Sequence, residues 1–345
     1  MRMVGVCKHI LLTHLLSSLS AFVYKVRGIY KEKIMKHIFG PVPSRRLGAS
    51  LGIDIIPDKT CSYDCVYCQL GRTTNKTIER KEYVQNDAII VELKSLLSTL
   101  ESPRKAIDYI TFSGSGEPTL NSAIGNLSRE FKIITDIPIA VLTNGSLLYR
   151  EDVRDALSNA DLVVPSLDAV TEEVFQKVNR PHPSLTIEKV IDGIKEFSNS
   201  FNGEIWLEIM LVKGINDGQE EIERMAEVAA DMNLAKIQLN TVIRPPTEKF
   251  ALPLNAEEMQ QIKEKMGEKA EVIAHFDRNK EKIYKGDVET EILAMLQRRP
   301  CTVLDISKAL SLHINEVIKY IEQMQKNNSV KSVTQQNEVY YQVIK

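Results

Sequence analysis

Three cysteines, Cys61, Cys65 and Cys68, lie on one short segment, KTCSYDCVYCQLGRTT. Their spacing, C-x3-C-x2-C, lets three thiolates converge on one metal or cluster without any long-range folding. A [4Fe–4S] cluster is usually held by four cysteines, one on each iron. A loop that supplies three leaves one iron open to a substrate or cofactor, as the open position of a catalytic zinc does. We therefore expect one [4Fe–4S] cluster with three cysteine ligands here.

Two other uses of these thiols stay open. A structural zinc site usually combines two separated C-x2-C pairs, or a cysteine pair with a histidine pair, whereas the remaining cysteines, Cys7 and Cys301, stand alone. A thiol–disulfide redox motif needs only Cys65 and Cys68, which would leave Cys61 without a role. The cluster uses all three thiols, so we favour it over zinc or redox chemistry.

The loop resembles the signature of the radical S-adenosylmethionine (SAM) enzymes, Cys-x3-Cys-x-aromatic-Cys, with Tyr67 at the aromatic position. In that family the methionine amino and carboxylate groups of SAM chelate the open iron, and the aromatic residue lies near the adenine. The resemblance therefore implies that Tyr67 contacts SAM, although a packed core aromatic is an equal interpretation of Tyr67 alone. The resemblance to the family covers roughly Met35 to Phe276. It is closest to an uncharacterised group of these proteins that opens with FGPVPSRRLG.

Short apolar segments alternate with longer amphipathic ones from Leu47 onward. We expect strands at Leu51–Ile56, Tyr109–Phe112, Ile137–Leu142, Leu162–Pro165, Ile205–Leu211 and Lys236–Asn240. We expect helices at Asn86–Leu100, Ile124–Ile134, Glu151–Leu157, Ile187–Phe197, Glu220–Met232 and Ala256–Met266. This alternation indicates βαβ units and a parallel sheet. The expected fold is α/β, a partial (β/α)6 TIM-like barrel of the radical SAM type.

Catalytic residues of such barrels cluster at the C-terminal ends of the strands. The second expected strand is followed by Ser113–Thr119, where glycines let the backbone approach a ligand. The Glu117 carboxylate can accept hydrogen bonds from an ammonium group. Gly116 and Glu117 resemble the family's Gly-Gly-Glu motif, which holds the methionine amino group of SAM, with Ser115 in place of the first glycine. A glycine-rich turn is the structural alternative.

The next two strand ends carry further candidates for SAM contacts. The third strand leads into Thr143, and the fourth into Ser166 and Asp168. Their side chains can reach the ribose hydroxyls or the methionine carboxylate, and in the family residues after the fourth strand contact the ribose. A local role is the alternative for Thr143, which precedes an Asn-Gly turn signal, and for Asp168, which is placed as a helix N-cap.

Cationic side chains follow the last two strands and are candidate substrate contacts. Lys213 follows the fifth strand and Arg244 the sixth, and either can pair with an anionic substrate. Arg45 and Arg46, ahead of the first strand, can clamp a phosphate or carboxylate as well. The residues around Lys213 resemble those of the molybdenum-cofactor cyclase. That enzyme also has C-terminal cysteines and a terminal glycine pair, which this sequence does not show, so this function is disfavoured.

Residues 35–276 form the expected core, 277–286 a linker and 287–345 a separate unit. Its expected elements are helices Val288–Gln297, Val303–Ala309 and Ile314–Asn327, then strands Val330–Val333 and Val339–Val343. This order is typical of a winged helix, a module that usually binds DNA. Seven acidic residues balance seven basic ones in the unit, and duplex binding relies on uncompensated cations. We expect a protein partner at least as much as a nucleic acid.

Composition limits the partners and the cellular location that the sequence allows. The net charge of −2 gives no general attraction to nucleic acid or anionic membranes, and no apolar stretch is long enough to span a bilayer. Within residues 1–34 the apolar run Ile10–Tyr24, flanked by basic residues, resembles a weak signal peptide. An oxidising compartment suits an iron–sulfur enzyme badly. We therefore favour a true start at Met35, or a non-essential extension, and a cytoplasmic location.

These features predict a radical SAM enzyme. A reduced [4Fe–4S] cluster would cleave SAM to methionine and a 5′-deoxyadenosyl radical, which takes hydrogen from an unidentified substrate. The resemblance also implies an electron donor such as ferredoxin or flavodoxin. Modified tRNA is the second substrate class, although no basic or aromatic RNA platform is visible. An iron–sulfur sensor that binds nucleic acid or protein through the winged helix is the alternative. The barrel and the glycine–glutamate motif favour catalysis, because a sensor needs neither.

Overall fold

The computed structural model describes residues 36–44, 46–273, 288–310, 312, 314–336 and 338–344. The expected N-terminal extension, residues 1–34, and the expected linker, residues 277–286, lie outside the described residues, as does Arg45. Within the described residues no helix combines the length and the apolar character that a membrane crossing requires.

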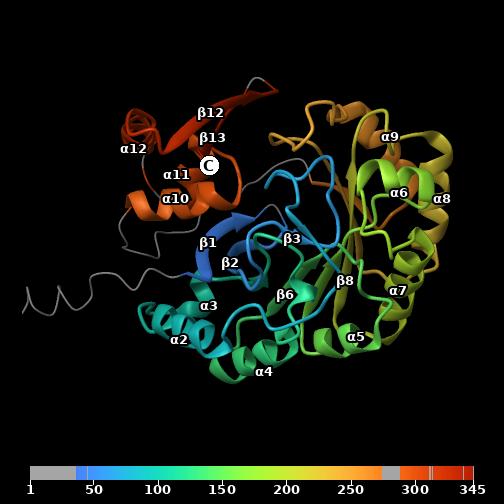
Figure 1. Cartoon of the computed structure of the whole chain (residues 1–345), viewed down its shortest axis with the longest axis horizontal. Coiled ribbons are helices and arrows are strands. Elements are labelled where there is room, and N and C mark those ends of the chain that lie inside the picture. Colours follow the sequence, from blue (N-terminus) through green and yellow to red (C-terminus); the bar gives the residue numbers. More distant parts are fainter. Residues whose placement is uncertain are drawn as a thin grey trace, which may run out of the picture. The chain divides into compact units, whose positions relative to one another are not determined.

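An eight-stranded sheet, in the order β1-β2-β5-β6-β7-β8-β9-β10, organises the larger part of the described chain (Figure 1). Its strands are β1 (Ile38–Ser44), β2 (Gly48–Ile53), β5 (Tyr109–Phe112), β6 (Ile139–Thr143), β7 (Leu162–Pro165), β8 (Glu204–Leu211), β9 (Lys236–Thr241) and β10 (Ala270–Val272). β1 pairs antiparallel with β2, and every later neighbour pairs in parallel. The carboxyl ends of the parallel strands therefore meet at one edge of the sheet.

This architecture confirms the expected α/β fold, since β2 and β5 to β9 are the six strands predicted from the apolar segments. The two edge strands were not predicted. β1 contains Pro41 and Pro43, which have no backbone donor and read as loop residues. β10 is only three residues long, too short for a pattern to show.

Helices lie around the outside of the sheet (Figure 1). They are α2 (Asn86–Leu97), α3 (Pro103–Ala106), the 3-10 turn η1 (Pro118–Leu120), α4 (Ile124–Ile134), α5 (Glu151–Leu157), α6 (Glu172–Val178), α7 (Ile187–Ser200), α8 (Gln219–Ala230) and α9 (Ala256–Met266). The six predicted helices are present, and α6 was missed because only Phe175 and Val178 are buried on it.

Helix α7 shows why these segments are helical. Thr186 caps its first turn by accepting a hydrogen bond from the Lys189 amide at 3.4 Å. Apolar side chains spaced three and four residues apart form one buried face, Ile187, Val190, Ile194 and Phe197. Each such side chain contributes about 1.5–3 kcal/mol when it is fully buried, so the packing of this face against the sheet holds the helix in place.

The C-terminal unit has three helices and a small antiparallel sheet of order β11-β13-β12. Its elements are α10 (Val288–Arg298), β11 (Cys301–Thr302), α11 (Val303–Leu310), α12 (Ile314–Lys326), β12 (Val330–Gln335) and β13 (Glu338–Val343). It has its own buried apolar cluster, in which Ile292, Ile306 and Val317 are fully covered. The helices and the hairpin lie where they were predicted. β11, of two residues, was not foreseen, and the winged-helix interpretation stays a prediction.

This unit contacts the barrel at two places that are far apart in the sheet order. Val42 of β1 packs against the apolar cluster of the unit, and the Arg298 guanidinium lies over the Phe39 ring at 3.9 Å. The Tyr340 hydroxyl donates a hydrogen bond to the carbonyl of Ile243, after β9, at 2.9 Å. The C-terminal unit thus bridges the β1 edge of the sheet and the loop that follows β9.

Candidate functional site

The three cysteines leave the sheet together on the loop that follows β2. Cys61 ends the short strand β3 (Thr60–Cys61), which pairs with β4 (Asn75–Lys76), and Cys65 and Cys68 follow on the connecting loop. None of the three cysteines is in a disulfide, and each residue keeps partial exposure. The loop therefore presents its sulfurs at the carboxyl edge of the sheet, where the strand-end residues also lie.

The end of α6 holds this loop in position. The Asp64 amide donates a hydrogen bond to the Asn179 carbonyl at 3.0 Å, and the Val66 amide donates to the Val178 carbonyl at 3.0 Å. Gly116 packs closely on the other side, because a Cβ added there would lie 1.9 Å from the Thr60 carbonyl oxygen. The glycine is required by this close approach of the two segments.

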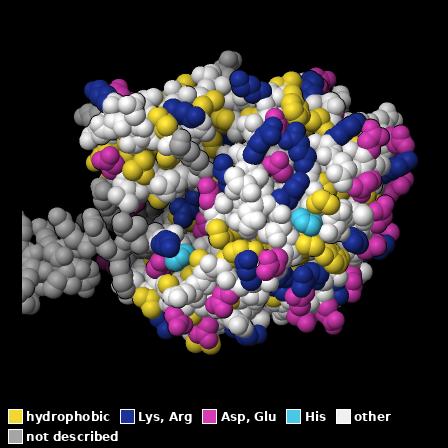
Figure 2. Space-filling view, in the orientation of Figure 1, with side chains coloured by type: hydrophobic (Ala, Val, Ile, Leu, Met, Phe, Trp, Pro, Cys, Tyr) yellow, Lys and Arg dark blue, Asp and Glu magenta, His cyan; other side chains and the backbone are white. Residues whose placement is uncertain are grey.

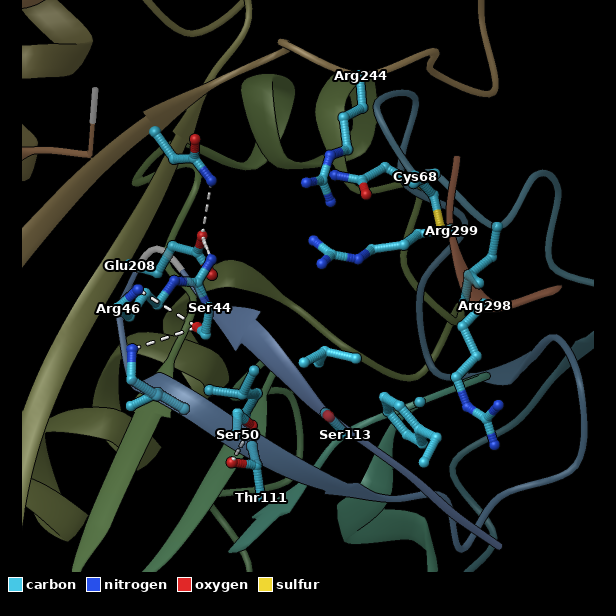
Figure 3. Close-up of a pocket in the computed structure, with 18 of the residues that line it drawn as sticks. Ser44, Arg46, Ser50, Cys68, Thr111, Ser113, Glu208, Arg244, Arg298 and Arg299 are labelled. Atoms are coloured by element: carbon cyan, nitrogen blue, oxygen red, sulfur yellow. Dashed lines mark hydrogen bonds and ion pairs between the residues drawn. The ribbon is translucent and has the colours of Figure 1, made fainter. Parts of the chain in front are cut away.

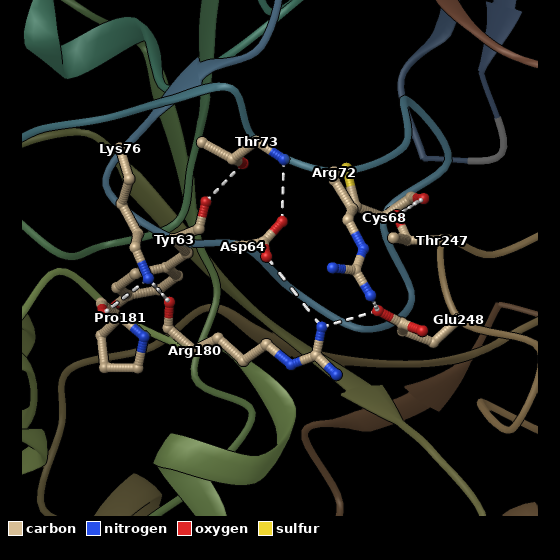
Figure 4. A network of polar contacts seen from close by, with 10 residues as sticks. All are labelled: Tyr63, Asp64, Cys68, Arg72, Thr73, Lys76, Arg180, Pro181, Thr247 and Glu248. Carbon is tan, nitrogen blue, oxygen red and sulfur yellow. Dashed lines mark hydrogen bonds and ion pairs between the residues drawn. The ribbon is translucent and has the colours of Figure 1, made fainter.

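A second anchor comes from the segment after β9 (Figure 4). The Thr247 hydroxyl donates to the Cys68 carbonyl at 2.8 Å. Glu248 Oε1 accepts hydrogen bonds from Arg72 at 2.8 Å and from Arg180 at 2.7 Å, so one carboxylate joins the loop to the end of α6. These contacts restrain the third cysteine of the loop.

Three thiols on one loop suit an iron–sulfur cluster by their chemistry, whereas among the described residues no group of three or more His, Cys, Asp or Glu side chains is already placed to hold a metal ion. Soft thiolates are the ligands that such clusters take.

The protein environment keeps these thiols protonated in the absence of a metal. Burial, and then the nearby Glu117 carboxylate, raise the pKa of Cys61 to about 12. Burial also raises the pKa of Cys65 and of Cys68. Asn144 Nδ2 lies 3.5 Å from the Cys61 sulfur, and Asn179 Nδ2 lies 3.4 Å from the Cys65 sulfur. Cluster assembly must therefore displace protons from the thiols.

Glu117 is buried at the end of β5 and is joined to the end of β6. Its Oε1 accepts hydrogen bonds from the Thr143 hydroxyl at 2.6 Å and from the Thr119 amide at 3.0 Å, and its Oε2 accepts from the Asn144 amide at 2.7 Å. Burial raises the pKa of Glu117, and these hydrogen bonds oppose the rise. The carboxylate is thus fixed in orientation, with acceptor capacity left on Oε2.

Ser115, at the first glycine position of the motif that the sequence resembles, directs its side chain to Asp54. Its hydroxyl donates to Asp54 Oδ2 at 2.6 Å, and its amide lies 3.2 Å from both Asp54 oxygens. The neighbouring Gly114 could not carry a side chain, since an added Cβ would lie 2.3 Å from the Asp54 carboxyl carbon. The Ser115 side chain therefore leaves the Gly116–Glu117 pair undisturbed.

Asp168, buried after β7, connects the cysteine loop to two other elements. Its carboxylate accepts hydrogen bonds from the Tyr67 hydroxyl, from Asn179 Nδ2 at 2.7 Å and from the Met210 amide at 2.9 Å. Burial raises the pKa of Asp168 to about 6, while the hydrogen bonds from Tyr67, Met210 and Asn179 act in the opposite direction. The carboxylate positions Tyr67 and, through Asn179, the surroundings of Cys65.

The hydroxyl groups of two predicted SAM contacts, Thr143 and Ser166, differ in the hydrogen bonds that they make to the protein. The Thr143 hydroxyl donates to Glu117 and accepts from the Gly145 amide at 3.1 Å, so it acts on the geometry of Glu117. Ser166 is partly exposed beside it, with its amide bonded to the Thr143 carbonyl at 3.0 Å. Within the described part of the chain the Ser166 hydroxyl makes no hydrogen bond, which leaves it able to bind a ligand.

The structure separates the two predicted substrate contacts. Lys213 pairs with Glu258 of α9 at 2.7 Å, and its side chain is 47% exposed. Arg244 is buried, lies 3.5 Å from Asp305 of α11, and lines a cavity of about 360 Å³. A substrate would have to compete with Glu258 for Lys213, whereas Arg244 lines a cavity.

The cavity adjoins the cysteine loop at Tyr67 and Cys68 (Figure 3). Strands β2, β5, β8 and β9 supply Ser50, Thr111, Glu208 and Asn240 to its wall. The C-terminal unit supplies Met295, Arg298 and Arg299. These last residues were not predicted as part of a site, because only the contact of the C-terminal unit with the barrel places them there.

Asn179, Thr247 and Glu248 are further residues of the site that the sequence analysis missed. Asn179 is the residue after α6, the helix that went unpredicted, and its partners Cys65 and Asp168 are distant in sequence. Thr247 and Glu248 follow a proline-rich loop whose course the sequence does not indicate. No motif singles these residues out, so only the folded arrangement could reveal them.

Comparison with known proteins places this arrangement in a family. The Radical SAM superfamily pattern matches residues 55–229. A UPF0026 protein of Methanocaldococcus jannaschii is 44% identical over 269 residues, which is 76% of this chain and 82% of that protein. A protein of Brachyspira hyodysenteriae named GTPase Obg is 40% identical over 300 residues, 86% of this chain. The chain spans only 43% of the length of that relative.

One solved structure is similar to part of this chain. It is a radical SAM methyltransferase from Sphaerobacter thermophilus, 16% identical, with a TM-score of 0.49 over 65% of this chain and 65% of that one.

Proposed function

Because the chain belongs to the radical SAM superfamily, and is therefore an enzyme that uses SAM and an iron–sulfur cluster, we propose that Cys61, Cys65 and Cys68 hold a [4Fe–4S] cluster with one open iron. The observation that carries this proposal is the position of the three thiols. They share one loop at the carboxyl edge of the parallel strands, and Glu117 and Asp168, the buried carboxylates at the ends of β5 and β7, lie beside them.

When bound and reduced, the cluster supplies an electron that breaks a C–S bond of SAM and yields a 5′-deoxyadenosyl radical able to take hydrogen from a substrate. The chain contributes the orientation of the reactants and the exclusion of water. Ferredoxin or flavodoxin is the kind of electron donor that we propose. The substrate is not identified by the fold, since one fold supports many reactions.

We assign the methionine end of SAM to the end of β5. Glu117 Oε2 has acceptor capacity for the ammonium group, and the Thr143 hydroxyl and the Asn144 amide hold the carboxylate in one orientation. Preorganised acceptors of this kind cost little reorganisation when the ligand arrives. Gly116 keeps the backbone of this turn close to the cysteine loop.

We assign the nucleoside end of SAM to Tyr67 and Ser166. Asp168 receives three hydrogen bonds from the protein, so we propose that it acts by positioning Tyr67 beside the adenine. Ser166, with its hydroxyl unbonded within the described residues, is the better candidate for a ribose contact.

The ligand assignment is tested by iron content after anaerobic reconstitution with iron and sulfide. The wild-type chain should bind about four irons with the Mössbauer signature of a [4Fe–4S] cluster. Cys65→Ala should bind almost none, and Cys301→Ala, which removes a buried thiol of the C-terminal unit, should match the wild type. A Cys65→Ala protein that keeps four irons, or a colourless wild type that binds zinc, would refute the assignment.

A further inference from the structure

The cavity beside the cysteine loop concentrates positive charge. Four arginines line it, Arg46, Arg244, Arg298 and Arg299, and Glu208 is the one carboxylate among its described lining residues (Figure 3). The arginines come from the turn after β1, the loop after β9 and the end of α10. Segments distant in sequence therefore bring like charges into one cavity, an arrangement that is unfavourable where the charges are buried unless an anion is bound there.

Two of these cations have a carboxylate partner in the protein. Arg46 forms an ion pair with Glu208, whose Oε1 also accepts a hydrogen bond from Asn240 Nδ2 at 3.1 Å. Arg244 has Asp305 as its partner at 3.5 Å, which is longer than a hydrogen bond. The guanidinium of Arg244 is therefore only weakly compensated.

The other two cations form no ion pair within the described residues, although the charges of Asp54 and Glu92 act on Arg298. Arg298 donates to the Ala294 carbonyl at 3.0 Å and stacks on Phe39. Arg299 forms neither an ion pair nor a side-chain hydrogen bond in the described part of the chain. Figure 3 shows its guanidinium extended into the cavity beneath Arg244. The Arg299 guanidinium is thus available to bind a ligand in the cavity.

The environment of Arg244 also indicates a site for an anion. It is only 6% exposed, and its Nε is buried without a hydrogen-bond partner. Burial, and then the charge of Arg299, lower the pKa of Arg244, but a guanidinium stays protonated in proteins. A buried donor without a partner is unfavourable, so an anion that accepted from Nε would relieve both the unpaired donor and the repulsion.

We propose that this cavity binds the substrate, and that the substrate is a small molecule with a phosphate group. The proposal rests on the proposed function, since the cavity reaches the cysteine loop at Tyr67 and Cys68. Arg299 has no ion-pair partner within the described residues, and Arg244 has only the distant Asp305, so both guanidinium groups can bind an anion in the cavity. A phosphate, with about −1.5 to −2 charge at neutral pH, compensates two such cations better than one carboxylate does. Guanidinium forks also bind phosphate oxygens in pairs.

The carboxylate of SAM is the nearest competing anion. Our proposed SAM contacts, Glu117, Thr143, Ser166 and Asp168, do not line the cavity, and only Tyr67 belongs to both. The arginines therefore adjoin the SAM site without forming its methionine end.

A polynucleotide is the other source of phosphate. Lys, Arg, Asp and Glu side chains are intermixed on the face seen in Figure 2, while the arginines of the cavity are gathered in one recess that opens to solvent. The net charge of the chain is −2. A polynucleotide of many phosphates would need an uncompensated external surface, so we favour a small molecule.

The test measures the binding of inorganic pyrophosphate to the reconstituted full-length protein by isothermal titration calorimetry at constant ionic strength. Arg299→Gln should weaken pyrophosphate binding at least tenfold, and Arg299→Lys should recover part of the loss. Arg299 has no protein partner that its removal would leave unpaired, so folding should be preserved. Arg224→Gln, which removes an exposed arginine paired with Glu220 on α8, is the matched control and should bind like the wild type.

Three results would overturn the proposal. The wild type could fail to bind pyrophosphate. Arg299→Gln could weaken SAM binding as much as pyrophosphate binding, which would assign the arginine to the carboxylate of SAM. Transfer RNA could displace pyrophosphate at lower concentration than nucleoside monophosphates do, which would identify a polynucleotide. Because pyrophosphate binding requires no SAM cleavage, a chain that binds it but cleaves no SAM would refute the proposed function alone.

Discussion

The Tyr67 hydroxyl donates a hydrogen bond to the Asp168 carboxylate and so joins the cysteine loop to the end of β7. Asn179 Nδ2 donates to the same carboxylate at 2.7 Å and lies 3.4 Å from the Cys65 sulfur. One buried side chain thus restrains both an aromatic residue and a thiol of the loop. The site is held together across the strand ends as well as by the local turns of the loop.

Tyr67→Phe tests this restraint. The substitution keeps the ring but removes one of three donors to the buried Asp168 carboxylate, so the free energy of unfolding should fall by about 1–3 kcal/mol. Urea denaturation of the cluster-free protein measures it. Tyr83→Phe, which removes an exposed hydroxyl bonded to the Glu79 carbonyl, should change stability by less than about 0.5 kcal/mol. Equal effects of the two substitutions would show that the bond to Asp168 does not hold the loop.

Glu117→Gln separates cluster binding from SAM binding. The amide keeps the size of the side chain but loses the charge that attracts the ammonium group, so SAM affinity should fall about 10- to 100-fold. Iron content should stay at the wild-type level, because Glu117 is no ligand in our assignment. Equilibrium dialysis with labelled SAM measures the affinity, and Glu173→Gln on the exposed face of α6 is the control. Unchanged affinity would remove Glu117 from the SAM site.

Gly116→Ala tests the close contact between the turn after β5 and the cysteine loop. The added methyl would lie 1.9 Å from the Thr60 carbonyl, so the segments must separate, at a cost of about 1–3 kcal/mol. We expect lower stability and incomplete cluster loading. Gly218→Ala, where an added Cβ meets nothing within 4 Å, should cost less than about 1 kcal/mol. Full loading of Gly116→Ala with a stable cluster would contradict this account of the turn.

The reactivity of Cys61 should depend on pH in a specific way. Alkylation requires the thiolate, and burial with the Glu117 charge raises the pKa of Cys61 to about 12. In the cluster-free protein Cys61 should react with iodoacetamide at least about 100-fold more slowly than free cysteine at pH 8. The rate should rise about tenfold per pH unit up to pH 10. Peptide mapping by mass spectrometry measures the rate, and a plateau below pH 9 would show that the pKa is not raised.

The inner strands of the barrel could be predicted from the sequence because each is a short, continuous apolar segment between polar helices. The edge strand β1 could not, since the prolines at positions 41 and 43 hide it, and its pairing with β2 depends on a neighbour rather than on its own pattern. Helix α6 escaped prediction because Phe175 and Val178 alone do not make a periodic pattern. Local pattern therefore indicates the interior of the fold better than its edges.

The same distinction holds for the candidate site. The cysteines and Glu117 could be predicted because their spacing and their place after a strand are visible in the chain itself. Asn179, Thr247 and Arg299 could not, since each matters only through residues that folding brings to it. For Lys213 the sequence shows the position after a strand but not the partner, because Glu258 of α9, which pairs with it, is distant in the chain. Its role as a substrate contact stays a prediction.

The central claim is that this loop and these strand ends cleave SAM reductively. The most direct measurement is the anaerobic formation of 5′-deoxyadenosine, quantified by chromatography after the reconstituted chain is mixed with SAM and dithionite. We predict that the wild type forms it and that the variant with Cys61, Cys65 and Cys68 all changed to alanine forms none. A wild-type chain that carries a stable [4Fe–4S] cluster and binds SAM, yet forms no 5′-deoxyadenosine, would contradict the account.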